Sequence, residues 1–248
     1  MIRRPGGELA TRPLHFIWLA DCSGSMGNDG KIQALNTAIR EAIPHMQRVA
    51  DENPNAQVLV RAVKFASGAQ WHVAQPTPVA EFRWPDLKAG GHTDMGKALA
   101  LVAEALKMPP MSERALPPVL VLVSDGQPTD HFEAGLSALL DQPWGKKAVR
   151  MAIAIGEDAD HDVLQKFIGH PELRPLQANN PEALVSYIKW VSTAVLQAAS
   201  SPASQVAAPA PTPGTPDPAP LAGPAAPATH VPIPAPPAVG PLSAADVW

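Results

Sequence analysis

Apolar residues form two kinds of segment that alternate along most of the chain, from about residue 13 to residue 200. Continuous or alternating apolar runs predict strands at 15–19, 57–65, 70–73, 119–123, 148–155 and 173–176. Apolar residues that recur every three or four positions predict helices at 31–50, 94–107, 132–140, 163–168 and 181–199. Pro44 falls inside the first of these helices and is expected to kink or shorten it.

This order of elements is typical of an α/β domain with a doubly wound, mostly parallel sheet and helices on both faces. The segment 70–73 follows the strand at 57–65 after a short turn, so we expect it to be one antiparallel edge strand. In such a Rossmann-like sheet, ligands bind beyond the carboxyl ends of the strands. Candidate functional residues are therefore expected where strands end.

The composition changes sharply at about residue 200. Residues 201–248 contain 14 Pro and 13 Ala but no Lys or Arg. That composition cannot bury a core and favours an extended, disordered chain. We accordingly expect an N-terminal extension at 1–12, one domain at 13–200 and a disordered Pro/Ala-rich tail at 201–248, which would act as a tether.

Charge and cysteine content indicate which partners and which cellular compartment to expect. The net charge is −4 and no basic stripe is present, which argues against nucleic acid or an anionic membrane as a partner. Cys22 is the single cysteine, so no internal disulfide can form. The apolar stretch after Arg4 is too short for a secretory signal. We expect a cytoplasmic protein.

Oxygen-bearing side chains gather in three loops at strand ends or just before a predicted helix. The first loop holds Asp21, Ser23 and Ser25, the second holds Thr93, and the third holds Asp125. Because the ends of parallel strands lie side by side, these loops can converge despite their separation in sequence. Carboxylate and hydroxyl oxygens without sulfur or imidazole suit a hard cation, Mg²⁺ or Mn²⁺, better than Zn²⁺.

The Asp-x-Ser-x-Ser sequence at 21–25, the later Thr93 and Asp125 in the sequence Ser-Asp-Gly-Gln-Pro after an apolar strand together resemble the von Willebrand factor A domain. The resemblance covers about residues 13–199. It implies the metal-ion-dependent adhesion site of that family, with hydroxyl ligands from Ser23, Ser25 and Thr93. It also implies that Asp21 and Asp125 bind the ion directly or through water.

The resemblance further implies a binding module and not an enzyme. In the family, an Asp or Glu of a partner protein completes the coordination of Mg²⁺. The general form is similar to TerY-like proteins of tellurium resistance and stress, which implies a protein kinase and a metal-dependent phosphatase as partners. The alternatives are an adaptor of a MoxR-type ATPase and, from another class, a metal-dependent phosphohydrolase. Because the site lies on loops, Asp125→Ala is expected to lose the ion while the fold survives.

Each motif also has a simpler interpretation when taken alone. Asp and Ser form local turns, and Thr93 could cap the following helix. Residues 91–98 approach the phosphate-binding loop pattern, but Ala98 stands where its hydroxyl residue should be and no apolar strand precedes it. Cys22 is expected to be buried and structural. The combination of all three loops favours the metal site.

Overall fold

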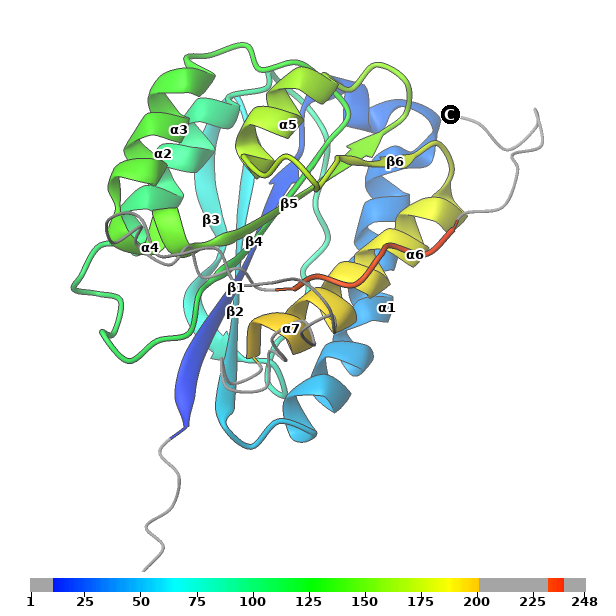
Figure 1. Ribbon diagram of the computed structural model, residues 1–248. Helices are drawn as coiled ribbons and strands as arrows, with labels where there is room; N and C mark the ends of the chain where they lie inside the picture. The colour runs from blue at the N-terminus through cyan, green and yellow to red at the C-terminus, as the bar shows by residue number, and fades with distance from the viewer. Residues whose placement is uncertain (1–10, 201–231, 239–248) are drawn as a thin grey trace, which may run out of the picture.

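A computed structural model describes residues 11–200 and 232–238 of the chain. One six-stranded sheet, in the order β3-β2-β1-β4-β5-β6, forms the centre of the domain. All neighbouring strands are parallel except β2 and β3, which are antiparallel. Helices cover both faces of the sheet (Figure 1). The predicted doubly wound fold with one antiparallel edge strand is therefore confirmed.

The elements follow the alternation seen in the sequence. The strands are β1 (Arg12–Asp21), β2 (Ala56–Ala66), β3 (Gly68–Pro78), β4 (Val119–Ser124), β5 (Val149–Ile155) and β6 (Leu176–Ala178). The helices are η1 (Gly24–Gly30), α1 (Lys31–Asp51), α2 (Met95–Ala105), α3 (Phe132–Asp141), α4 (Pro143–Lys147), α5 (His161–Ile168), α6 (Pro181–Trp190), η2 (Val191–Val195) and α7 (Leu196–Ser200).

Two hydrophobic cores lie on opposite faces of the sheet because side chains alternate along each strand. Phe16 and Trp18 of β1 belong to the cluster beneath α1 and α6. Ile17 and Leu19, between and after them, belong to the cluster beneath α2, α3 and α5. Both clusters are almost wholly buried. The central strands β1 and β4 are thus fixed from both sides, which gives the loops that follow them a rigid base.

The structure differs from the sequence predictions in several details, three of which concern α1, β6 and the closing helix. Helix α1 continues through Pro44 to Asp51, because Pro44 lies on the exposed side, where a carbonyl that has lost its hydrogen bond can face water. The last strand is Leu176–Ala178 and not 173–176. The closing helix is interrupted by a π-helical segment at Val191–Val195.

The antiparallel edge strand β3 is irregular. Its pairing with β2 shifts register on both sides of Ala62, and the strand ends at Pro78. Arg61 of β2 donates from Nε to the carbonyl oxygen of Ala74 at 2.9 Å, and its guanidinium lies 3.5 Å from the ring centroid of Trp71. These contacts join the two strands beside the register shift.

Most of the predicted tail falls outside the described residues, but residues 232–238 do not. This segment has no regular secondary structure and crosses α6 in Figure 1, where it is drawn in red. Ile233 is partly buried against the cluster beneath α1 and α6. The expectation of disorder therefore does not hold for these seven residues. In the described part of the chain, no helix combines the length and apolarity that a membrane span needs.

Candidate metal centre

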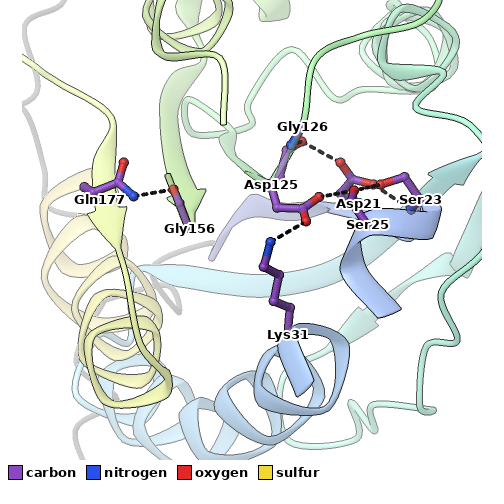
Figure 2. Close-up of polar contacts among 9 residues, drawn as sticks. Asp21, Ser23, Ser25, Lys31, Asp125, Gly126, Gly156 and Gln177 are labelled. Carbon is purple, nitrogen blue, oxygen red and sulfur yellow. Dashed lines mark hydrogen bonds and ion pairs between the residues drawn. The ribbon is translucent and has the colours of Figure 1, made fainter. Parts of the chain in front are cut away.

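The candidate centre lies at the carboxyl ends of β1 and β4, the two middle strands of the sheet. These strands pair in parallel as far as Ala20 and Val123, so Asp21 and Asp125 follow at the same edge. Figure 2 shows Asp21, Ser23 and Ser25 facing Asp125 across this edge. The convergence of the first and third loops, about 100 residues apart in sequence, thus occurs as predicted.

Asp21 is a buried carboxylate whose two oxygens both accept hydrogen bonds. Its Oδ1 accepts from the backbone N–H of Ser23 at 2.7 Å, and its Oδ2 accepts from the Ser124 hydroxyl at 2.5 Å. Its relative exposure is 0%. Burial raises the pKa of Asp21 from its ordinary value of 3.8 to about 6, against the lowering effect of the Ser124 and Ser23 hydrogen bonds. A nearby cation would favour the charged carboxylate.

The three predicted hydroxyls also lie at this edge. The Ser23 and Ser25 hydroxyl oxygens are 3.0 Å apart, and Ser25 donates to Oδ1 of Asp125 at 2.7 Å. A Cβ atom added to Gly126 would lie 3.8 Å from both the Ser25 Oγ and the Thr93 Oγ1. Thr93 therefore reaches the same small region, and the structure brings all five predicted residues together.

The position of Thr93 depends on residues that the sequence analysis missed. Asn36 of α1 holds the loop that leads to it: its side-chain oxygen accepts from Trp84 Nε1 and the Leu87 backbone N–H, each at 2.9 Å. Thr93 and Thr129 are joined by two hydrogen bonds of 2.9 Å, from the Thr93 N–H to Thr129 Oγ1 and from the Thr129 N–H to the Thr93 carbonyl. The second and third loops are thereby tied directly to each other.

Thr93 is not the N-cap of the next helix. The N-cap of α2 is Asp94, which makes no side-chain capping bond. Instead, Asp130 accepts from the backbone N–H groups of Gly96 and Lys97, both at 2.8 Å. The Thr93 side chain is therefore not used for capping.

Lys31 is a further residue that the sequence analysis missed. It is the first residue of α1, follows Gly30 in the left-handed conformation, and is only 5% exposed. Its Nζ lies 2.9 Å from Oδ2 of Asp125, whose side chain is fully buried (Figure 2). A lysine at the start of a helix normally faces solvent, so nothing in the sequence pattern marks this buried ion pair.

The ion pair corrects one expectation. Asp125→Ala was expected to spare the fold because the site lies on loops. Asp125 is 1% exposed, however, and its removal would leave the Lys31 ammonium buried without its partner. Removing one member of a buried pair is strongly destabilising. Asp125→Asn is therefore the better variant for testing the ion.

Glycines and small residues form the solvent-facing side of the cluster. Ser25 is partly exposed, whereas Gly24 and Gly91 are exposed and joined by a 3.0 Å hydrogen bond from the Gly24 N–H to the Gly91 carbonyl. Gln127 is also exposed, and Gly126 before it is partly so. Because glycine has no side chain, a group from outside can approach Ser25 and Asp125 closely.

Cys22 has no role at this opening. It is 3% exposed and belongs to the core cluster beneath α1 and α6. Burial, followed by the nearby charge of Asp21, raises the pKa of its thiol to about 12. It is a buried structural cysteine, as its position in the sequence predicts.

The donor set fits a hard divalent cation. Two carboxylates and three hydroxyls supply only oxygen, the ligand type that Mg²⁺ and Mn²⁺ prefer. Within residues 11–200 and 232–238, no group of three or more His, Cys, Asp or Glu side chains could hold a metal. Asp21 and Asp125 together bring two negative charges, and Lys31 is paired directly with only one of them. The centre can therefore accommodate a cation.

Residues 16–127 match the family model of the von Willebrand factor type A domain. This match spans the first, second and third loops up to Gln127. No curated protein sequence matches the chain.

Solved structures share the fold at low sequence identity. The ArnB paralog VWA2 from Sulfolobus acidocaldarius is 19% identical, with a TM-score of 0.53 over 71% of this chain and 44% of that one. The von Willebrand factor type A protein from Catenulispora acidiphila is 18% identical, with a TM-score of 0.58 over 75% of this chain and 43% of that one. Proximal thread matrix protein 1 from the mussel byssus was solved with a zinc-occupied MIDAS motif. It is 17% identical, with a TM-score of 0.56 over 73% of this chain and 48% of that one.

The chain thus spans less than half the length of each of these three proteins. At such identities the likeness concerns the fold alone. The fold is that of the solved von Willebrand factor type A structures.

Proposed function

We propose that this domain binds protein partners through a divalent cation held by Asp21, Ser23, Ser25, Thr93 and Asp125. Mg²⁺ is the preferred ion and Mn²⁺ the alternative. The observation that carries the proposal is the convergence of two buried carboxylates and three hydroxyls at the carboxyl ends of β1 and β4.

The chain itself sets the chemistry of the contact. A bound divalent cation would supply positive charge and an exchangeable coordination position for a carboxylate of the partner. Ser23, Ser25 and Thr93 are neutral, so they add donor oxygens without adding negative charge. The glycines beside Ser25 leave the approach open to the Asp or Glu of a partner.

The arrangement favours binding over catalysis. Asp21 accepts bonds on both oxygens from Ser23 and Ser124, and Asp125 is held on both oxygens by Ser25 and Lys31. These bonds fix the orientation of both carboxylates, and a bound cation would keep them ionised and engaged, which disfavours their use as a base toward a substrate. The raised pKa of Asp21 belongs to the metal-free centre, and a cation would reverse it. A phosphohydrolase remains the less supported function.

The identity of the partner is the finer part of the proposal. The resemblance to TerY-like proteins favours a protein kinase and a metal-dependent phosphatase in a tellurium or stress response. A ring-shaped ATPase of the MoxR type is the alternative. Copurification of one or the other class with the full chain would distinguish them.

The first test is calorimetric titration of the full chain with Mg²⁺ and with Mn²⁺. Wild type should bind one ion, and Asp125→Asn should lose it. Asp141→Asn, at the exposed end of α3, is the matched control and should bind as wild type. Absence of binding by wild type would refute the metal site.

The second test is capture of partners from cell extract by the same three proteins, with Mg²⁺ or with EDTA. A partner retained by wild type and by Asp141→Asn only in Mg²⁺ would support ion-mediated docking. Equal capture under all conditions would show that the partner is recognised elsewhere on the chain.

A further inference from the structure

Lys31 is a buried cation placed directly behind the candidate metal centre. Its Nζ lies 2.9 Å from Oδ2 of Asp125, while Oδ1 of the same carboxylate accepts the Ser25 hydroxyl at 2.7 Å. The two oxygens of Asp125 therefore face different partners: one faces the hydroxyl cluster and the other faces the lysine. Lys31 thus holds the orientation of Asp125 without occupying the oxygen that faces Ser25.

The fold builds a specific place for this lysine. Gly30 has a φ of 76°, which turns the chain from η1 into α1 and puts Lys31 at the start of the helix. Gly156, just after β5, has a φ of 72°, and a Cβ atom there would lie 3.3 Å from Lys31 Nζ and 3.5 Å from its Cε. A larger residue at 156 would crowd the ammonium group.

The position of Gly156 is itself fixed by β6. Its N–H donates to the Ala178 carbonyl at 2.8 Å, and its carbonyl accepts from Gln177 Nε2 at 2.5 Å (Figure 2). Lys31 is thereby enclosed between the end of β4, the end of β5 and the start of α1. Its side chain is only 7% exposed, so the ammonium group is largely shielded from solvent.

We infer that Lys31 sets the charge balance of the centre so that the ion is held weakly until an external carboxylate joins it. This inference rests on the proposed metal site. Asp21, Asp125 and Lys31 together carry a charge of about −1, so a centre loaded with a divalent cation carries about +1. An Asp or Glu from a partner restores neutrality. Without the lysine, the loaded centre would already be neutral.

This charge balance assigns two effects to one side chain. Lys31 lowers the affinity for the cation, because like charges repel strongly inside a buried site. It also raises the affinity of the metal-loaded centre for an anionic ligand, because opposite charges attract there. The domain would then bind partners that present a carboxylate and would bind neutral surfaces poorly.

The test uses Lys31→Gln in the full chain, because glutamine can still donate a hydrogen bond toward Asp125 but carries no charge. Lys97→Gln is the matched control, since Lys97 also pairs with an aspartate, Asp94, at 2.7 Å but lies exposed on the surface. Lys31→Met provides a second variant, and circular dichroism confirms that each variant is folded.

Mn²⁺ affinity is measured by calorimetry in chloride buffer and again with acetate as the carboxylate probe. Lys31→Gln should bind Mn²⁺ at least about tenfold more tightly than wild type in chloride. Acetate should tighten Mn²⁺ binding to wild type and to Lys97→Gln, but much less to Lys31→Gln. Lys97→Gln should keep the wild-type affinity in both buffers.

Three outcomes would overturn the inference. Equal or weaker Mn²⁺ binding by both Lys31 variants would show that the lysine only positions Asp125. An equal effect of acetate on wild type and Lys31→Gln would show that charge balance does not select the ligand. Absence of Mn²⁺ binding by wild type would instead refute the proposed metal site and, with it, this inference.

Discussion

Asp21→Asn is expected to stabilise the metal-free protein while abolishing ion binding. Asp21 is fully buried, and burial raises its pKa from 3.8 to about 6. Because the carboxyl group of the unfolded chain ionises at lower pH, the unfolded state gains stability relative to the folded state between pH 3.8 and about 6. The cost to the folded state is absent below pH 3.8, fully present above about pH 6, and constant at higher pH.

The magnitude follows from the two pKa values. At about 1.4 kcal/mol per pH unit, the interval from 3.8 to about 6 corresponds to about 3 kcal/mol. Asparagine removes this cost but replaces one of the two hydrogen bonds imperfectly, a loss of about 1 kcal/mol. The metal-free variant should therefore be about 2 kcal/mol more stable than wild type at neutral pH, or about 4–8 °C in Tm.

The assay is urea unfolding in EDTA at a series of pH values, followed by circular dichroism. The quantity of interest is the difference between variant and wild type, because other groups titrate in the same range. Burial, followed by the nearby charge of Arg61, lowers the pKa of His15 to about 4, so His15 makes the folded state less stable as the pH falls from 6.5 to about 4. The subtraction removes this opposite contribution.

The difference should be near zero or slightly unfavourable at low pH and should grow as the pH rises to about 6. Titration of the same sample with Mg²⁺ should show no binding. A variant that is less stable than wild type at neutral pH would refute the reasoning, since the Ser124 and Ser23 hydrogen bonds would then outweigh the cost of burial.

Three further outcomes follow from the contacts described above. Asp125→Ala should lower the free energy of unfolding in EDTA by about 3–5 kcal/mol, because it leaves the Lys31 ammonium buried without a partner. A loss below about 1 kcal/mol in urea unfolding would contradict a buried ion pair. The Cys22 thiol, with a pKa of about 12, should resist a disulfide reagent in the native protein and react fully in urea, as followed by absorbance. Gly135→Ala would place a methyl group 2.1 Å from the Gly96 carbonyl oxygen, so α3 must move away from α2. A loss of about 1–3 kcal/mol is expected in urea unfolding, and an unchanged midpoint would show that the two helices separate freely.

The parts of the fold that could be predicted are those with a local signal. Apolar runs and three-to-four spacing mark the strands and helices, and parallel order brings Asp21 and Asp125 to one edge. The short strand at Leu176–Ala178 was misplaced because three residues carry almost no periodicity. Helix α1 begins after Gly30, whose left-handed conformation is not marked by any apolar pattern.

The parts of the site that could not be predicted depend on contacts between distant segments. The burial of Lys31 requires Gly156, which lies more than a hundred residues later in the chain. The hydrogen bonds that Asn36 accepts from Trp84 and Leu87 depend on the path of the loop before Thr93, which no periodic pattern indicates. Such residues look like ordinary surface positions until the sheet has brought their partners to them.

The irregular pairing of β2 and β3 has a consequence for how the domain can associate. An open strand edge normally invites another chain to extend the sheet, in peptide recognition as in amyloid growth. Here β3 is bulged along its pairing with β2 and has Pro76 and Pro78 at its end, which cannot donate ladder hydrogen bonds. The opposite edge, β6, is only three residues long. Neither edge is a good template for strand addition, which protects the domain against edge-to-edge aggregation and directs association to side-chain surfaces.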